Sequence, residues 1–133
     1  MGKDIKSRKD IEALINSFYD KVKADPVIGF IFNEVVRVNW QHHLPVMYDF
    51  WENMLLHTGS YTGNPIEIHQ RLNQTVPLKR AYFQQWLHLF TSTVDDLFTG
   101  ITAEMAKQRA FSISGVMQAK LSNLPDGSLQ DGA

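Results

Sequence analysis

The sequence predicts an all-α fold. Apolar side chains recur at helical spacing in nearly every long segment, and no segment alternates between apolar and polar residues as a strand does. The length, 133 residues, and the composition, 44% hydrophobic and 20% charged, are those of one soluble domain with a real core. We therefore expect a single domain over residues 1–124 and a flexible C-terminal tail over residues 125–133.

The first helix is expected from about Asp10 to Lys23, because its apolar residues fall on one face. Ser7 or Asp10 stands where an N-cap residue belongs. The Asp25-Pro26 pair ends this helix, and residues 27–32 continue as an apolar short helix or turn.

The second helix is expected over about residues 39–56, with a wide apolar stripe. Pro45 lies within this stripe, and a proline in a helix interior costs about 3 kcal/mol because it lacks an N–H. Two outcomes are open: the regular helix begins nearer His43, or it is kinked at the proline. The orientation of His43 depends on which outcome holds.

Residues 57–64 form a turn-rich loop, after which Asn64 caps a short helix that reaches about Leu72. A long helix follows from about Leu78 to Phe98, and Gly100 ends it. The last helix is expected over about residues 102–124. Its buried side chains are predicted to be Met105, Ile113, Val116, Met117, Leu121 and Leu124.

Composition excludes several classes of function. A net charge of −1 argues against a nucleic-acid or anionic-membrane partner. The longest apolar stretch, VIGFIF, is too short to span a bilayer, and the N-terminus has no secretory signal, so a cytoplasmic location is expected. The absence of cysteine excludes thiolate metal sites and covalent haem attachment. The sequence motifs of zinc proteases, di-iron bundles, nucleotide-binding folds and serine hydrolases are also absent.

A histidine in the short helix, His69, draws attention because it lies one turn from Ile66 and Leu72 and so points toward the interior. Most such histidines are core residues bonded to a carbonyl. Here, however, His43 lies on the helix before the loop and His69 on the helix after it, so the two can face opposite sides of a flat ligand. An all-helical chain with an inward histidine and an 11% aromatic content has what a haem pocket requires.

Several motifs, in order, resemble the truncated haemoglobins, and within them the third group. They are FYDKVKADPVIGFIF, with Phe32 thirteen residues after Tyr19; WQHHL; FWENMLL; YTGNPI; IEIHQRL; and FQQWLHLF, with Trp86 seventeen residues after His69. The likeness covers about residues 11–121, and the combination of His43 with Trp86 points to the third group.

The resemblance implies a two-over-two helical sandwich that binds haem b, iron protoporphyrin IX. It implies that His69 is the proximal iron ligand and that Tyr19, His43 and Trp86 are the distal residues that stabilise a bound ligand. The residues that it implies for contact with the cofactor are His69, Phe32, Met47, Trp51, Leu72, Phe83 and Trp86. Pro45, two residues after His43, departs from the family pattern.

The function expected from this resemblance is the binding of O2, NO or CO at a ferrous iron. One alternative is a redox enzyme, a nitric oxide dioxygenase or a peroxidase-like protein, served by an unidentified reductase. The other is a haem-free helical interaction domain, in which the aromatic residues only pack the core.

Overall fold

The computed structural model of the protein describes residues 3–35, 39–58 and 79–122. It contains α1 (Arg8–Ala24), the π-helix η1 (Ile31–Val35), α2 (Trp40–Leu56), α4 (Arg80–Leu97) and α5 (Ile101–Ser122). The predicted all-α class is confirmed. The predicted short helix over residues 64–72, with His69 and Leu72, and the predicted tail over 125–133 lie outside the described residues.

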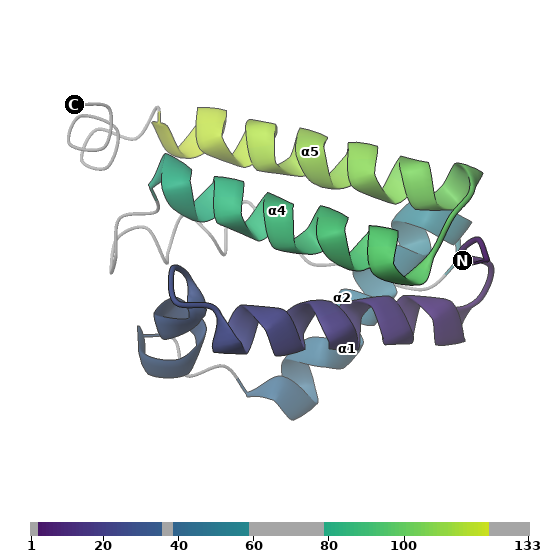
Figure 1. The fold of residues 1–133 in the computed structure, drawn as a ribbon, viewed down its shortest axis with the longest axis horizontal. Helices are drawn as coiled ribbons and strands as arrows, with labels where there is room; N and C mark the ends of the chain where they lie inside the picture. The colour runs from purple at the N-terminus through teal and green to yellow at the C-terminus, as the bar shows by residue number, and fades with distance from the viewer. Residues whose placement is uncertain (1–2, 36–38, 59–78, 123–133) are drawn as a thin grey trace.

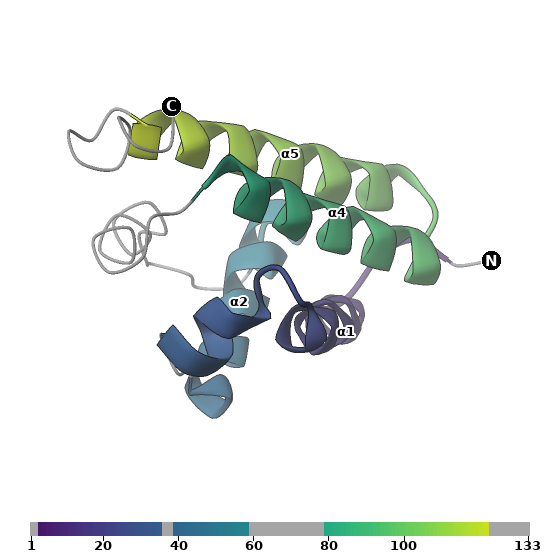
Figure 2. The same ribbon diagram turned by 60° about the vertical axis from the view of Figure 1, so that its left-hand side comes forward.

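Two pairs of helices make up the described part of the fold. In both views α4 and α5 lie side by side (Figures 1 and 2). Helix α1 lies beneath α4, and in Figure 1 α2 crosses behind α1. The core between the pairs is built from fully buried side chains of α1 and α4, among them Leu14, Phe18, Phe90 and Val94. Within the described residues, no helix is long and apolar enough to cross a membrane.

Helix α1 begins where the sequence places a cap. The Ser7 hydroxyl accepts a hydrogen bond from the Asp10 N–H at 3.4 Å, and the Asp10 carboxylate accepts one from the Lys6 N–H at 2.9 Å. Together these hydrogen bonds satisfy two backbone donors next to and within the first turn of the helix. The helix begins two residues before the predicted Asp10, because the cap is Ser7.

Pro45 does not delay the start of α2. The helix runs without interruption from Trp40 to Leu56, with Asn39 as its N-cap residue and Pro45 inside it. The His43 N–H donates to the Asn39 carbonyl at 2.8 Å, so the regular hydrogen bonds begin before the proline. Of the two outcomes that the sequence left open, a regular helix that begins nearer His43 is therefore excluded. His57 ends α2 in the left-handed conformation, with φ of 61°.

The buried face of α5 differs from the prediction. The side chains that it buries are mostly small: Ala103, Ala106, Ala110, Ser114 and Met117. Val116, predicted to be buried, is 48% exposed, and Met105 and Ile113 are only half-buried. Small residues allow α5 to approach α4 closely, and a search for large apolar side chains overlooks such a face. The side chains of Leu121 and Leu124 lie outside the described set.

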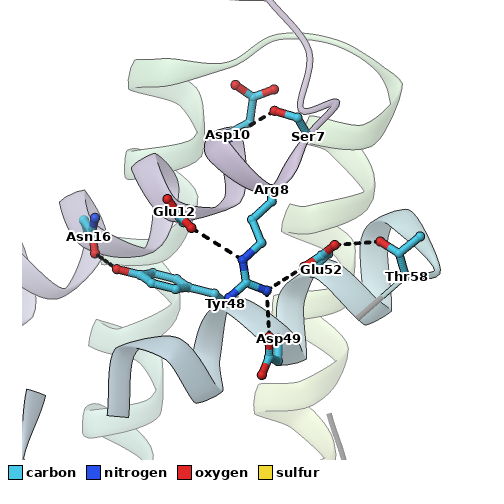
Figure 3. Close-up of polar contacts among 9 residues, drawn as sticks. All are labelled: Ser7, Arg8, Asp10, Glu12, Asn16, Tyr48, Asp49, Glu52 and Thr58. Atoms are coloured by element: carbon cyan, nitrogen blue, oxygen red, sulfur yellow. Dashed lines mark hydrogen bonds and ion pairs between the residues drawn. The ribbon is translucent and has the colours of Figure 1, made fainter. Parts of the chain in front are cut away.

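Polar contacts join the helices, and two sets of them involve the N-terminal part of the chain. The Arg8 guanidinium of α1 donates to Asp49 at 2.6 Å and to Glu52 at 2.7 Å, and both acceptors lie on α2 (Figure 3). In the second set the N-terminal segment reaches α5, where the Asp4 carboxylate accepts from the N–H groups of Thr102 and Ala103 at 3.0 and 2.8 Å. Asp4 thereby satisfies helix-start donors from a distant part of the chain.

Candidate functional site

The candidate site is built around Tyr19, which lies in the last two turns of α1. The residue is 7% exposed. Burial raises the pKa of its hydroxyl well above the usual value of 10.0. The phenol therefore stays protonated at any physiological pH and remains a hydrogen-bond donor.

Three rings from η1 and α2 pack around Tyr19. Its centroid lies 5.1 Å from that of Trp40, 5.4 Å from that of His43 and 6.1 Å from that of Phe32. We call Tyr19, Phe32, Trp40 and His43 the Tyr19 cluster. These residues come from α1, η1 and α2, so three elements converge on one phenol.

His43 faces into this cluster. It is half-buried, its Nε2 atom is shielded from solvent, and its ring meets the Tyr19 ring edge-on at 76°. The neighbouring His42 is exposed, as the helical period predicts for a residue about 100° away. The inward orientation of His43 follows from the uninterrupted start of α2, which sets its angle around the helix axis.

Trp86 lies on α4 and belongs to a second group of rings, with Phe18, Trp51 and Phe90. Its indole stacks on Phe90 at 5.7 Å and meets Phe18 edge-on at 5.7 Å. Trp51 of α2 stacks on the same Phe90 at 4.7 Å. Phe18 also packs on Tyr19 at 4.8 Å, so it joins this second group to the Tyr19 cluster. Trp86 is therefore held one ring away from Tyr19.

Three other sequence-derived candidates lie on the described elements. Met47 is half-buried on α2, one turn beyond His43, and Phe83 is 9% exposed on α4, one turn before Trp86. Phe32 is half-buried in η1. The predicted axial ligand His69 and the predicted contact residue Leu72 lie outside the described residues, so their roles stay predictions from the sequence.

The Asp25-Pro26 turn fixes the segment that carries Phe32. The Asp25 carboxylate accepts from the N–H groups of Val27 and Ile28 at 2.9 and 3.0 Å and from the Gln85 amide of α4 at 2.7 Å. Burial by itself would raise the pKa of Asp25, but the hydrogen bonds from Ile28, Gln85 and Val27 outweigh burial and lower it. The carboxylate is thus an ionised anchor between the turn and the helix that bears Trp86.

Sequence reasoning missed Trp40 as a member of the site. It belongs to the predicted apolar stripe of α2, and its proximity to Tyr19 depends on how α1 and α2 cross. The local signal was present nevertheless: Trp40 precedes His43 by three residues, which places both side chains on one face of the helix.

The donor chemistry of the site fits a haem pocket. Aromatic and thioether side chains line the region, while a phenol hydroxyl and a shielded imidazole nitrogen are its polar groups. A buried donor is costly when it lacks a polar partner, so such a site suits a small polar ligand held in an otherwise apolar pocket.

Comparison with known proteins finds one similar curated protein and one similar solved structure. No family model matches the chain. The chain is similar to the group 3 truncated hemoglobin ctb of Campylobacter jejuni subsp. jejuni serotype O:2, with 30% identity over 118 residues that cover 86% of this chain and 91% of the relative. The fold is similar to the crystal structure of a group III truncated hemoglobin from Campylobacter jejuni, with a TM-score of 0.79 and 29% identity over 91% of this chain and 95% of the other.

Proposed function

This chain belongs to the group III truncated haemoglobins, and from that membership we propose that it binds O2 and other small diatomic ligands, such as NO and CO, at a haem b. The observation that carries the proposal is the pairing of a buried, protonated Tyr19 hydroxyl with the inward His43 imidazole, 5.4 Å apart between ring centroids. Relatives named as hemoglobins support the same ligand class.

Haem b, when bound, supplies a ferrous iron with one coordination position open to a diatomic ligand. We assign His69 as the residue that holds the iron, from its inward position in the sequence pattern and from the resemblance of IEIHQRL to the family motif. A neutral imidazole is the usual protein ligand for such an iron, and its second nitrogen is free to donate to a carbonyl or carboxylate.

The described residues would contribute a set of hydrogen-bond donors to a bound ligand. Tyr19 offers a hydroxyl, His43 an imidazole N–H in one tautomer, and Trp86 an indole N–H. A hydrogen bond to a charged or strongly polarised acceptor contributes about 1.5–3 kcal/mol. Each effective donor therefore slows the loss of a polar ligand by about tenfold to a hundredfold.

The proposal assigns five residues to the walls of the pocket: Phe32, Met47, Trp51, Leu72 and Phe83. Their apolar side chains exclude water, and exclusion of water strengthens each hydrogen bond that the donors make. Ligand binding that is tight in this way suits sensing, scavenging or redox turnover better than bulk delivery of oxygen.

An absorption spectrum of the purified protein tests the proposal. We expect a red protein whose Soret band shifts when carbon monoxide is added after reduction with dithionite. The His69→Ala variant is expected to lose haem or to change its coordination, because it lacks the axial imidazole. The matched control is His42→Ala, which removes an exposed histidine and leaves the spectrum unchanged.

Two results would contradict the proposal at different levels. A colourless wild-type protein that takes up no added haemin would identify a helical interaction domain instead. A His69→Ala variant with wild-type haem retention and spectrum would reject the axial assignment while the haem function stands.

A second candidate function, a nitric oxide dioxygenase or peroxidase-like activity, draws on the same donors. Hydrogen bonds from Tyr19, His43 and Trp86 would polarise a bound ligand as well as retain it. Polarisation of the ligand is what redox turnover needs. The dioxygenase activity would also need a reductase as a partner. Steady-state consumption of nitric oxide in the presence of a reductant, set against stoichiometric binding, separates the enzyme from the sensor or scavenger.

A further inference from the structure

Trp40 occupies a central place in the Tyr19 cluster. Its ring centroid lies 5.1 Å from that of Tyr19 and 5.6 Å from that of His43, while Tyr19 and His43 lie 5.4 Å apart. The three rings thus form a nearly equilateral triangle. Every pair falls within the 4.5–7 Å range in which aromatic rings attract one another, and none is parallel, since the interplanar angles are 55°, 77° and 76°.

The Trp40 indole is itself held from other directions. Phe32 stacks on it at 6.1 Å with an interplanar angle of 21°. The Lys23 ammonium lies 5.0 Å from the centroid of the same indole, a distance at which a cation is attracted to the ring face. Because Trp40 precedes His43 by one helical turn, its backbone is fixed by the same hydrogen-bonded start of α2. Trp40 is therefore held by contacts beyond its two partners in the triangle.

The two rings that Trp40 contacts are the two proposed donors. A phenol has two rotatable side-chain bonds, and so has an imidazole, and each ring keeps one orientation only while its neighbours exclude the others. Trp40 is a wall common to both rings, since it is in contact with Tyr19 and His43 at once.

We propose that Trp40 is a positioning residue, which holds the Tyr19 hydroxyl and the His43 imidazole in the orientations from which they donate to a common ligand. The inference rests on the proposed function, since it concerns the donors of that site. Trp40 acts through Tyr19 and His43 and makes no hydrogen bond to the ligand itself. Loss of the indole frees both rings at once, so a single substitution disturbs two donors.

The test compares Trp40→Leu with Trp40→Phe in the haem-loaded, carbon monoxide-bound protein. The infrared C–O stretch responds to the direction of nearby donors, and each donor orientation gives its own band. We expect one dominant band in the wild type and in Trp40→Phe, which keeps a ring as the wall. We expect several or broadened bands in Trp40→Leu, with oxygen dissociation faster by about threefold to tenfold.

Phe30→Leu is the matched control for lost stability. Phe30 is a half-buried aromatic residue whose ring pairs with Tyr82 at 5.9 Å, outside the triangle. Its replacement removes an aromatic contact of the same kind, so it lowers the thermal midpoint but leaves the C–O band of the wild type. If Trp40→Leu does not fold, Trp40→Met, whose flexible side chain fills the space without a ring, takes its place under the same criteria.

The outcomes separate this inference from the proposed function. A wild-type protein that holds no haem defeats the proposed function and this inference with it. A haem-loaded Trp40→Leu or Trp40→Met protein with the wild-type C–O band, and with oxygen dissociation within about twofold of wild type, overturns the role of Trp40 and leaves the proposed function intact. Broadening in Phe30→Leu as well would assign the effect to stability and would also overturn it.

Discussion

Tyr19 joins two properties that the proposed function needs. It is nearly fully buried, and its pKa is raised by that burial, so the hydroxyl keeps its proton while it stays out of water. Around it, Trp40 and His43 complete a triangle of rings, whereas Trp86 is reached through Phe18. Because His43 contacts Tyr19 and Trp86 does not, we expect these two donors to contribute unequally to ligand retention.

Replacement of Trp86 by Phe tests how much Trp86 contributes to retention of bound oxygen. The change removes the indole N–H but keeps an aromatic ring to stack on Phe90. We expect oxygen dissociation to become severalfold faster, because one hydrogen-bond donor is lost while the packing is largely kept. Stopped-flow kinetics measure the rate. Tyr82→Phe, one turn earlier on α4, is the control and should leave the rate unchanged. A wild-type rate in Trp86→Phe would remove Trp86 from the donor set.

At the scale of elements, the N-terminal segment fastens the start of α5. The Thr99 N–H donates to the Lys3 carbonyl at 3.0 Å, and the Asp4 carboxylate accepts from the first turn of the helix. Gly100 makes this approach possible. Its φ of 145° is strained for other residues, and a Cβ there would lie 2.6 Å from Asp4 Oδ2 and 2.7 Å from Asp4 Cβ.

Two glycine-to-alanine substitutions, one just before α5 and one within it, should change the free energy of unfolding in opposite directions. Gly100→Ala is expected to lower the free energy of unfolding by about 1–3 kcal/mol, because it adds backbone strain and displaces Asp4. Gly115→Ala is the control: a Cβ there meets no atom within 4 Å, so the helix gains about 0.5–1 kcal/mol. Urea denaturation followed by circular dichroism measures both changes. Equal stability of the two variants would refute the role assigned to Gly100.

At the scale of the molecule, three ionised aspartates hold the ends of the elements: Asp4 at α5, Asp10 at α1 and Asp25 at the turn before η1. In each, burial by itself raises the pKa, but hydrogen bonds outweigh it and the pKa is lowered. These bonds come to Asp4 from Thr102, Ala103 and Ile5, to Asp10 from Lys6, Lys3 and Ser7, and to Asp25 from Ile28, Gln85 and Val27. The folded state therefore binds these protons less readily than the unfolded chain does.

Stability should fall with acid as a consequence. The contribution of the three carboxylates is complete above the ordinary aspartate pKa of 3.8 and is lost as the pH drops through the lower values of the folded state. We expect the free energy of unfolding of the wild type to decline more steeply between about pH 5 and pH 2 than that of the Asp4→Asn, Asp10→Asn, Asp25→Asn triple variant. Urea titrations at a series of pH values measure the two slopes.

The control for this pH dependence is Asp96→Asn, which removes an exposed carboxylate that pairs with Lys21 at 2.9 Å. Surface ion pairs contribute little, so this variant should keep the steep slope of the wild type. A triple variant as acid-sensitive as the wild type would place the sensitivity elsewhere, for example in the carboxylates that Arg8 joins between α1 and α2 (Figure 3).

The sequence by itself determined the helical class, the approximate bounds of α1, α2, α4 and α5, and the family. Each rests on local information: apolar period, the Ser7 cap, the Asp25-Pro26 break, the Gly100 stop, and the order of the motifs. The candidates Tyr19, His43 and Trp86 came from the same source. Their roles, like those of His69 and Leu72, are proposals.

The tertiary structure decided what depends on how helices cross. The crossing of α1 and α2 brings Trp40 against Tyr19, 21 residues away in sequence, and no periodicity within one helix encodes that distance. The close approach of α4 and α5 makes alanines, not the larger Val116, the buried face of α5. Helical period fixes which side chains share a face, but the partner of that face is chosen by packing over the whole chain.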